Sequence, residues 1–411
     1  MADSQKKKVL IIGAGVAGPL LALVLQHKGF EPVIYERHKE NPPGGLAMQL
    51  SGQSLKVLNL LGLAEGALAL ALPLEHAKHR SELTGRVFLD APAGAGIRAA
   101  TGWPLCTVIR ATYGAYLLDA VKQRGIELHW GKKFVGLREE GEKVIAEFVD
   151  GSEAEGDLLV GCDGIHSTVR DVLFGKTPAE FTGLVGIAGY TPFTEKLHPS
   201  PPMTVEQVWG DGCHYICLPL RQERYMWAVN MPEDTPGMLE DWRTVRPATD
   251  EQVGKMLKAL PCYDWGGGVG DVIKGTTELI KFGLYIRPIA PVWHKGRAVL
   301  LGDAAHPTTP FLGQGANQST EDVYHLVRCL LQHAPLTSES LDKAFTEYAA
   351  VRMDRVRRTI EQTKAEGDLR RISGREACLA REEVLARGMG TDTWKIILEM
   401  VSGPFTGESE I

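Results

Sequence analysis

VLIIGAGVAGPLLALVLQHKGFEPVIYE, residues 9–36, has the pattern of a strand, a glycine-rich turn, a helix and a second strand. Val9–Ile12 is a short aliphatic run, as expected for a buried strand. Apolar residues then recur at helical spacing as far as Leu25, and Gly29 is a typical residue to end a helix. Pro32–Glu36 indicates the second strand. The stretch therefore predicts a βαβ unit, the opening of a Rossmann-like α/β fold.

The glycines of this unit have the spacing of a dinucleotide-binding turn. The first permits a tight turn, the second lets the backbone approach a pyrophosphate, and the third allows the helix to pack closely on the strand. The helix start presents oriented N–H groups to the anion. Glu36 can accept hydrogen bonds from ribose hydroxyls, which favours FAD or NAD over NADP at this site. The predicted cofactor contacts of this unit are Gly13, Gly15, Ala17, Gly18, Glu36 and Arg37.

The composition is that of a globular protein with a slight excess of acidic residues. The 411 residues are 44% hydrophobic and 23% charged, and the net charge is −6. This length suffices for two domains, and without a concentrated basic face we expect neither nucleic acid nor a membrane as a partner. The seven cysteines have no companion ligands at metal-site spacing, so we expect no bound metal. Because the cofactor motif begins so near the N-terminus, we expect no cleaved signal peptide and a cytoplasmic location.

The rest of the chain alternates between two kinds of pattern. Apolar runs such as Leu158–Cys162 indicate strands buried on both faces, with helices expected near 52–61, 113–124 and 314–332. Residues 183–285 instead show alternating strands, which indicate an antiparallel sheet. We predict an α/β fold in which a Rossmann-like, glutathione-reductase-type dinucleotide-binding domain is interleaved with a β-sheet substrate domain and followed by a helical region. The dinucleotide-binding domain is expected to comprise residues 1–71, 105–182 and 286–340. The substrate domain is expected to comprise residues 72–104 and 183–285, and the helical region residues 341–411.

The C-terminal region is rich in arginine. Its arginines alternate with apolar residues at helical spacing, which predicts a packed helix with a solvated basic face rather than a binding patch. They are Arg352, Arg355, Arg357 and Arg358.

Two further motifs place acidic residues at the ends of predicted strands. Asp163-Gly164 follows one buried run, where such a pair often only ends the strand. The other motif follows the run Ala298–Leu301 and comprises GDAAHP at 302–307, Pro310 and GQGAN at 313–317. Asp303 could bind a polyol hydroxyl, and the later glycine pair leads into a helix whose start favours negative charge. One dinucleotide accounts for both helix starts, with its pyrophosphate at the first and the N1–C2 edge of a flavin at the second.

Together these motifs resemble the three fingerprints of the class A FAD-dependent monooxygenases, the single-component aromatic hydroxylases that include para-hydroxybenzoate and salicylate hydroxylases. The resemblance extends over about residues 8–350. It implies that Glu36 binds the adenosine ribose, Arg110 contacts FAD from a helix start, and Asp303 binds the ribityl chain. Asp163 would support the pyrophosphate region and the docking of NAD(P)H. The residues around the flavin edge would be Gly313, Gly315, Ala316 and Asn317.

The chain departs from the family pattern at two points. Ala47-Met48-Gln49 stands where the family often has Gly-x-Gly in the loop after Glu36, and we place Ala47 and Gln49 near the cofactor there. Pro19 replaces the small residue that usually follows the third glycine, a change that an early helix position tolerates.

The resemblance also implies the reaction. NAD(P)H binds transiently and reduces FAD, O2 adds as a flavin C4a-hydroperoxide, and one oxygen atom passes to an aromatic or other electron-rich small molecule. The protein would orient the cofactor and exclude water, with Pro310 beside the oxygen-reacting face of the flavin. A single dinucleotide fingerprint fits a nicotinamide that binds transiently.

Candidate substrate contacts lie on the β-rich segment. A phenol hydroxylase benefits from a base that removes the phenolic proton, and His214 or Tyr215 could do so. Each candidate could equally pack within the sheet or face water. His306, close to Asp303, is expected to fix its loop. The candidates on the sheet are Tyr190, His214, Tyr215, Arg224 and Trp227.

Other functions remain open on the sequence alone. A flavin halogenase would need a Trp-x-Trp-x-Ile-Pro motif, which is absent. A reductase or desaturase of the same fold, or a non-catalytic FAD-binding protein, would share the cofactor fingerprints. Decarboxylative hydroxylation and epoxidation are chemically close to ring hydroxylation. The expected partners are a small aromatic substrate and O2, and the expected assembly is a monomer or homodimer.

Overall fold

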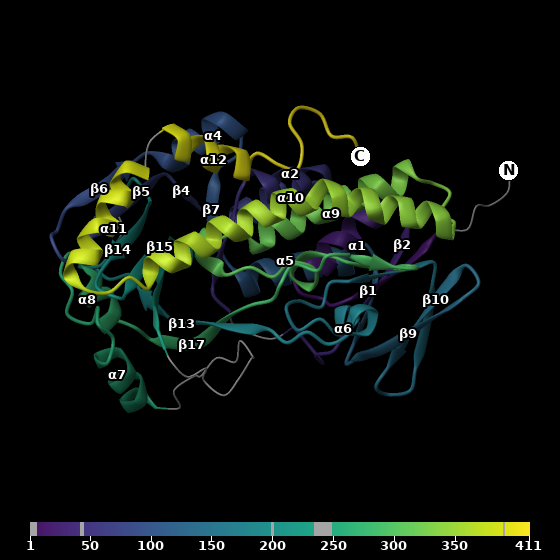
Figure 1. Cartoon of the computed structure of the whole chain (residues 1–411), viewed down its shortest axis with the longest axis horizontal. Coiled ribbons are helices and arrows are strands. Elements are labelled where there is room, and N and C mark those ends of the chain that lie inside the picture. Colours follow the sequence, from purple (N-terminus) through teal and green to yellow (C-terminus); the bar gives the residue numbers. More distant parts are fainter. Residues whose placement is uncertain (1–5, 42–44, 199–200, 234–248, 389–390) are drawn as a thin grey trace.

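The computed structural model describes residues 6–41, 45–198, 201–233, 249–388 and 391–411, and it is elongated, with two sheet systems side by side along its long axis (Figure 1). The first system carries the N-terminal βαβ unit, and the second carries the long antiparallel strands from the middle of the chain (Figure 1). Within the described ranges, no helix is both long and apolar enough to cross a membrane.

The first system is a three-layer α/β structure. Its six-stranded sheet is parallel except at β18, in the order β18 (His294–Lys295), β19 (Ala298–Leu300), β12 (Leu158–Gly161), β1 (Lys8–Ile12), β2 (Glu31–Glu36) and β8 (Glu127–Trp130). α1 (Ala17–His27) contacts both α5 (Arg110–Gln123) and α9 (Gly315–Gln332). An antiparallel sheet of β9 (Phe134–Glu140), β10 (Lys143–Phe148) and β11 (Glu153–Gly156) contacts β1 and β12. β12 is buried along its whole length because other layers cover both of its faces.

The second system is a seven-stranded sheet. Its order is β17 (Glu278–Ile286), β13 (Glu180–Pro192), β16 (Arg224–Pro232), β15 (His214–Leu220), β14 (Thr204–Trp209), β5 (His76–Ser81) and β6 (Val87–Ala91). One face packs against α7 (Asp250–Lys258) and α8 (Val269–Lys274) through a cluster that includes Tyr215 and Trp227. The opposite face contacts residues of the first system, including Leu46 and Phe311. This second face therefore borders the predicted cofactor turns.

Smaller elements connect the two systems. A sheet of β3 (Ala47–Leu50), β7 (Leu105–Ile109) and β4 (Leu72–Leu74) lies between them, with α2 (Gly52–Leu60), α3 (Ala64–Leu70) and α4 (Ala93–Thr101) nearby in the chain. α6 (Thr168–Phe174) contacts β9 of the first system. α10 (Ser338–Arg370) begins at a capping box formed by Thr337 and Ser340 and extends along both systems (Figure 1). α11 (Arg375–Gly388) and α12 (Thr391–Val401) follow it. A helix of this length, about 50 Å, can connect a cofactor turn with the distant sheet.

The sequence predicted most of these elements. The βαβ unit and the helices at α2, α5 and α9 are confirmed, and residues 72–104 do contribute β5 and β6 to the large sheet. Two details were wrong: β5 and β14 pair in parallel, and residues 250–258 and 269–274 form the helices α7 and α8 rather than strands. Thr249 caps α7 by accepting the Gln252 N–H, and acidic residues in the first turn favour that helix. The domain boundaries remain a prediction.

Candidate active site

Two positions of the first glycine turn, 13 and 18, have no room for a residue larger than glycine. Gly13 has φ +112°, and a Cβ there would lie 2.5 Å from the carbonyl oxygen of Cys162. A Cβ on Gly18 would lie 1.9 Å from the carbonyl oxygen of Gly13, because α1 packs directly on the turn. No side chain of the described residues caps the start of α1, so its N–H groups are available to an anion. This geometry fits a pyrophosphate at the turn.

Glu36 is buried at the end of β2 and holds the turn from the other side. Its Oε2 accepts the N–H of Ala14 at 2.7 Å, and its Oε1 accepts the N–H of His38 at 2.9 Å. Each oxygen retains a second lone pair for a ribose hydroxyl. Arg37 is exposed beside it. Glu36 is thus placed both to bind the ribose and to shape the turn.

Replacing Glu36 with glutamine is expected to weaken FAD binding by roughly 10–100-fold, because the amide nitrogen cannot accept one of the two backbone N–H bonds. Quenching of FAD fluorescence during titration of the apoprotein measures the affinity. Glu31→Gln, at an exposed position on the same strand, is the matched control. Equal affinities of the Glu36→Gln and wild-type proteins would contradict this role.

Arg110 brings the early and late motifs together. It opens α5, and its guanidinium would lie 3.7 Å from a Cβ on Gly15. Its positive charge also acts on Asp303, which is accessible to solvent although the surrounding protein desolvates it. That desolvation raises the pKa of Asp303, whereas His306 and Arg110 oppose the shift. The predicted contacts of residues 13–18, Arg110 and Asp303 therefore line one continuous region.

Asp163 accepts hydrogen bonds from the loop that follows it. Its Oδ1 accepts the hydroxyl of Ser167 at 2.5 Å, and its Oδ2 accepts the N–H groups of Thr168 and Val169 at 2.7 and 3.1 Å. Desolvation raises the pKa of this carboxyl, although these hydrogen bonds oppose the shift. Asp163 also lies next to Gly13, since a Cβ on that glycine would be 3.1 Å from the Asp163 Cα. Asp163 therefore shapes the edge of the first turn.

The late glycine turn is held by Asn317. The turn follows the short 3-10 helix Pro310–Leu312, and Gly313 has φ +62°. Asn317 Nδ2 donates to the carbonyl oxygens of Gly313 and Gln49, both at 3.0 Å. Its Oδ1 accepts from Ser51 and Ser54. Asn317 therefore positions the turn, and its side chain is fully engaged by the protein.

The start of α9 lies close to Asp303. A Cβ on Gly315 would be 3.9 Å from Asp303 Oδ1, and within the described part of the chain no side chain caps the helix start. The predicted contacts Ala47 and Gln49 lie on β3, which contacts α9, and Gln49 borders Gly313. Two uncapped helix starts, with Glu36 near one and Asp303 near the other, fit the negative groups and hydroxyls of an extended FAD.

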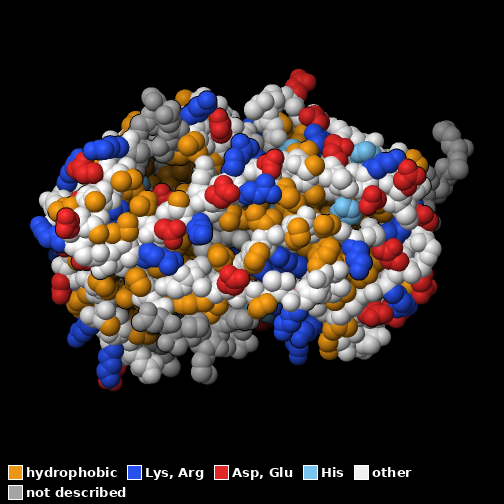
Figure 2. All heavy atoms as spheres, in the orientation of Figure 1, with side chains coloured by type: hydrophobic (Ala, Val, Ile, Leu, Met, Phe, Trp, Pro, Cys, Tyr) orange, Lys and Arg blue, Asp and Glu red, His pale blue; other side chains and the backbone are white. Residues whose placement is uncertain are grey.

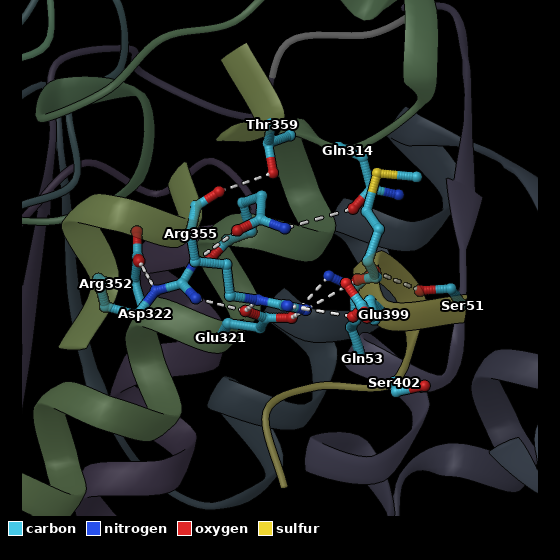
Figure 3. Close-up of polar contacts among 12 residues, drawn as sticks. Ser51, Gln53, Gln314, Glu321, Asp322, Arg352, Arg355, Thr359, Glu399 and Ser402 are labelled. Carbon is cyan, nitrogen blue, oxygen red and sulfur yellow. Dashed lines mark hydrogen bonds and ion pairs between the residues drawn. The ribbon is translucent and has the colours of Figure 1, made fainter. Parts of the chain in front are cut away.

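A buried ionic network behind the turns was not predicted (Figure 3). Asp322 Oδ2 accepts the N–H of Gly302 at 2.9 Å and lies 2.6 Å from His306 Nε2, so His306 does fix its loop. Asp322 Oδ1 accepts from Arg352 Nε at 2.7 Å, and Arg352 also binds Glu321. Burial would raise the pKa of Asp322, but the charges of His306 and Arg352 hold it at about 2.

The network continues to the C-terminal segment and to the start of α2. Arg355 binds both oxygens of Glu321, at 2.6 and 2.7 Å, and donates to the carbonyl oxygens of Glu399 and Met400 (Figure 3). Glu321 also accepts from Gln53, which in turn accepts from Ser51. The prediction of a solvated basic face was wrong for Arg352, which is completely buried while Val351 is exposed. Acidic partners on α9 compensate its charge, and helical spacing alone did not reveal them.

The predicted substrate residues lie on both faces of the large sheet. Tyr190 faces the first system, where its hydroxyl donates to the carbonyl oxygen of Gly45 at 2.7 Å. Tyr215 and Trp227 are buried on the opposite face, against α7 and α8, so the structure does not bring them to the cofactor turns. Arg224 stacks over Tyr190 and pairs with Glu278 at the surface.

His214 lies on the cofactor-facing side, but both of its ring nitrogens are engaged. Nδ1 accepts from Arg370 Nε at 3.2 Å, and Nε2 lies 2.9 Å from Gln207 Oε1. Burial, followed by the charge of Arg370, lowers the pKa of His214 far below its ordinary value. The base role stays a prediction that this geometry does not favour. Pro310, by contrast, is exposed at the start of the late turn.

Comparisons with known proteins agree with this geometry. A family model described as an FAD binding domain matches residues 6–257 and 285–363. The chain is 30% identical to 3-amino-4-hydroxybenzoate 2-monooxygenase of Streptomyces cremeus over 85% of this chain and 84% of the relative. It is 27% identical to 6-hydroxynicotinate 3-monooxygenase of Pseudomonas fluorescens, over 86% and 89% respectively. The crystal structure of Klebsiella pneumoniae HpxO with FAD and uric acid is 25% identical, with a TM-score of 0.83 over 97% of both chains.

Proposed function

Since the chain belongs to the FAD-binding family of aromatic-ring monooxygenases and is an NAD(P)H-dependent flavoprotein monooxygenase, we propose that it hydroxylates a small aromatic molecule held between the large sheet and the Pro310–Leu312 turn. One observation supports this placement most. Phe311, within that turn, packs on the cofactor-facing side of the sheet against the cluster of Leu184 and Phe282. A substrate there would be covered by apolar side chains and would lie next to the flavin end of the cofactor.

The chain's residues would perform three tasks. FAD, when bound, supplies the electron transfer and oxygen activation. The first turn and Glu36 would hold the adenosine end, while Asp303 and the start of α9 would hold the ribityl and flavin end. The sheet would close the cavity from water, which protects an oxygen-activating site from wasteful decay. Figure 2 shows a hollow with hydrophobic side chains toward the end of the molecule where α11 and β5 lie in Figure 1.

The expected result of an assay is substrate-stimulated NAD(P)H oxidation with one oxygen atom from O2 in the product. The FAD-loaded protein is mixed with NADH or NADPH, ¹⁸O2 and a panel of hydroxylated benzoates, hydroxypyridines, indoles and purines, and products are analysed by mass spectrometry. Oxidation of NAD(P)H without label in any product would instead favour the reductase or desaturase function. Loss of CO2 or a labelled epoxide would identify the corresponding alternative chemistry.

The location and assembly of the enzyme, and its independence of metal, belong to the same proposal. We expect a cytoplasmic enzyme that acts as a monomer or homodimer and needs no metal. Size-exclusion chromatography with light scattering measures the assembly, and a larger defined oligomer would contradict this expectation.

A further inference from the structure

A row of polar side chains crosses the cofactor-facing side of the large sheet. Arg370, the last residue of α10, donates through Nε to His214 Nδ1 at 3.2 Å. His214 Nε2 lies 2.9 Å from Gln207 Oε1, and Gln207 Nε2 lies 3.0 Å from His79 Nε2. These residues come from α10, β15, β14 and β5, so the row connects the long helix to three neighbouring strands. The reaction proposed above does not use it.

The hydrogen bonds of this row all run in one direction. A guanidinium can only donate, so His214 accepts at Nδ1 and carries its proton on Nε2. Gln207 then accepts at Oε1 and donates its amide N–H to His79 Nε2, which leaves the proton of His79 on Nδ1. Among the residues that the structure describes, Arg370 Nη1 and His79 Nδ1 are buried donors without a partner. Buried donors normally have partners, so the unpartnered N–H group of Arg370 is available to an acceptor on a ligand.

The row also carries a positive charge that is only partly compensated. Burial lowers the pKa of Arg370 to about 10 and that of His79 to about 4, so at neutral pH the arginine is charged and His79 is neutral. The carboxylate facing Arg370, that of Glu366, is 3.6 Å away and partly exposed. Arg381 adds a second cation beside Trp209, and Glu382 near it accepts from Ser81. A buried cation is costly unless it is paired.

Arg370 lies where the sheet meets the late turn. Its guanidinium is 4.3 Å from the ring centroid of Phe311 and 5.7 Å from that of Trp209. Phe311 directly follows Pro310, the residue expected beside the reacting face of the flavin. A ligand group that contacts Arg370 would therefore extend from the substrate position of the proposed function, on which this inference rests.

We propose that Arg370 is a specificity-determining residue that binds a carboxylate of the aromatic substrate, and that His214 and Gln207 position it. The carboxylate accepts a hydrogen bond from Nη1. Its negative charge compensates the positive charge of Arg370, which Glu366 compensates only in part. Because Nη1 is out of contact with solvent, the guanidinium or Phe311 must shift when the substrate enters. The bound carboxylate is then shielded from water, which strengthens the ion pair.

Binding to the wild-type holoenzyme tests the preference directly. The FAD-loaded protein is titrated near neutral pH with 4-hydroxybenzoate, 6-hydroxynicotinate and 3-amino-4-hydroxybenzoate, each beside its carboxamide, and the change in flavin absorbance is followed. At least one carboxylate is expected to bind about 10-fold or more tightly than its amide. If no carboxylate binds more tightly than its amide, the proposal is overturned. The titration needs no turnover, so a protein that binds the carboxylate but incorporates no oxygen would contradict the proposed function alone.

Variants of Arg370 test whether this residue causes the preference for a carboxylate over its amide. Arg370→Gln is expected to weaken carboxylate binding by about 30-fold or more and to leave amide binding nearly unchanged. Arg370→Lys keeps the charge and should recover part of the preference. The matched control is Arg371→Gln, because Arg371 is exposed and pairs with Asp368. Equal weakening of carboxylate and amide by Arg370→Gln would assign Arg370 a merely structural role. If that variant does not fold, the wild-type comparison and Arg370→Lys decide.

Discussion

Replacing Arg352 with methionine is expected to lower the free energy of unfolding by about 3–5 kcal/mol. Arg352 is completely buried between Glu321 and Asp322, which are themselves completely buried. Removing the cation leaves two carboxylates close together in a low-dielectric environment, and His306 beside Asp322 and Arg355 beside Glu321 compensate them only in part. The large cost therefore comes from the unpaired carboxylates and exceeds the net contribution of the ion pairs themselves.

Denaturant unfolding of the FAD-free protein measures the change in stability. Arg357→Met is the matched control, since Arg357 lies on the same helix, is exposed, and pairs with the exposed Asp354 three residues away. That variant should change stability by less than about 1 kcal/mol. We also expect Arg352→Met to release FAD more readily, because Asp322 holds the N–H of Gly302 next to Asp303. A similar stability of the two variants would contradict the account of the network.

The sequence predicted those parts of the site whose signal is local. The turn at 13–18 is such a part, since the glycine spacing lies within one βαβ unit and the close contact of Gly18 with Gly13 and Ile11 lies within that unit as well. The late turn is another, because Gly313 is required by a positive φ within a short stretch. Local motifs that are predicted to contact one ligand can thus be recognised in the sequence, even when about 300 residues separate them.

Features that depend on distant partners were missed or misplaced. Helical spacing could not show that Arg352 faces inward, because its partners lie about 30 residues earlier on α9. Alternation along β15 indicates that His214 and Tyr215 lie on opposite faces of the sheet, but it does not show which face borders the cofactor turns. The engagement of His214 with Arg370 required the position of the end of α10, which is more than 150 residues away in sequence.

Replacing Gly18 with alanine is expected to abolish most FAD binding, with a loss in affinity of roughly 100-fold, equivalent to about 2.7 kcal/mol. The added methyl group would lie 1.9 Å from the carbonyl oxygen of Gly13 and 3.3 Å from Ile11. Neither neighbour can yield easily, because Gly13 is backbone in a tight turn and Ile11 is completely buried in β1. The start of α1 must therefore move away from β1, and its N–H groups no longer converge on the pyrophosphate. Overpacking should also lower the free energy of unfolding by about 1–3 kcal/mol.

Gly254→Ala separates this effect from the general consequences of adding a methyl group to a helical glycine. Gly254 lies within α7, and a Cβ there would have no neighbour within 4 Å among the described residues, so alanine should leave FAD binding unchanged and stabilise the helix by up to about 1 kcal/mol. Fluorescence titration with FAD and thermal unfolding of the apoproteins give both quantities. The two variants should thus shift stability in opposite directions. If Gly18→Ala bound FAD as well as Gly254→Ala did, the pyrophosphate could not lie at this turn, and the orientation assigned to FAD would have to be abandoned.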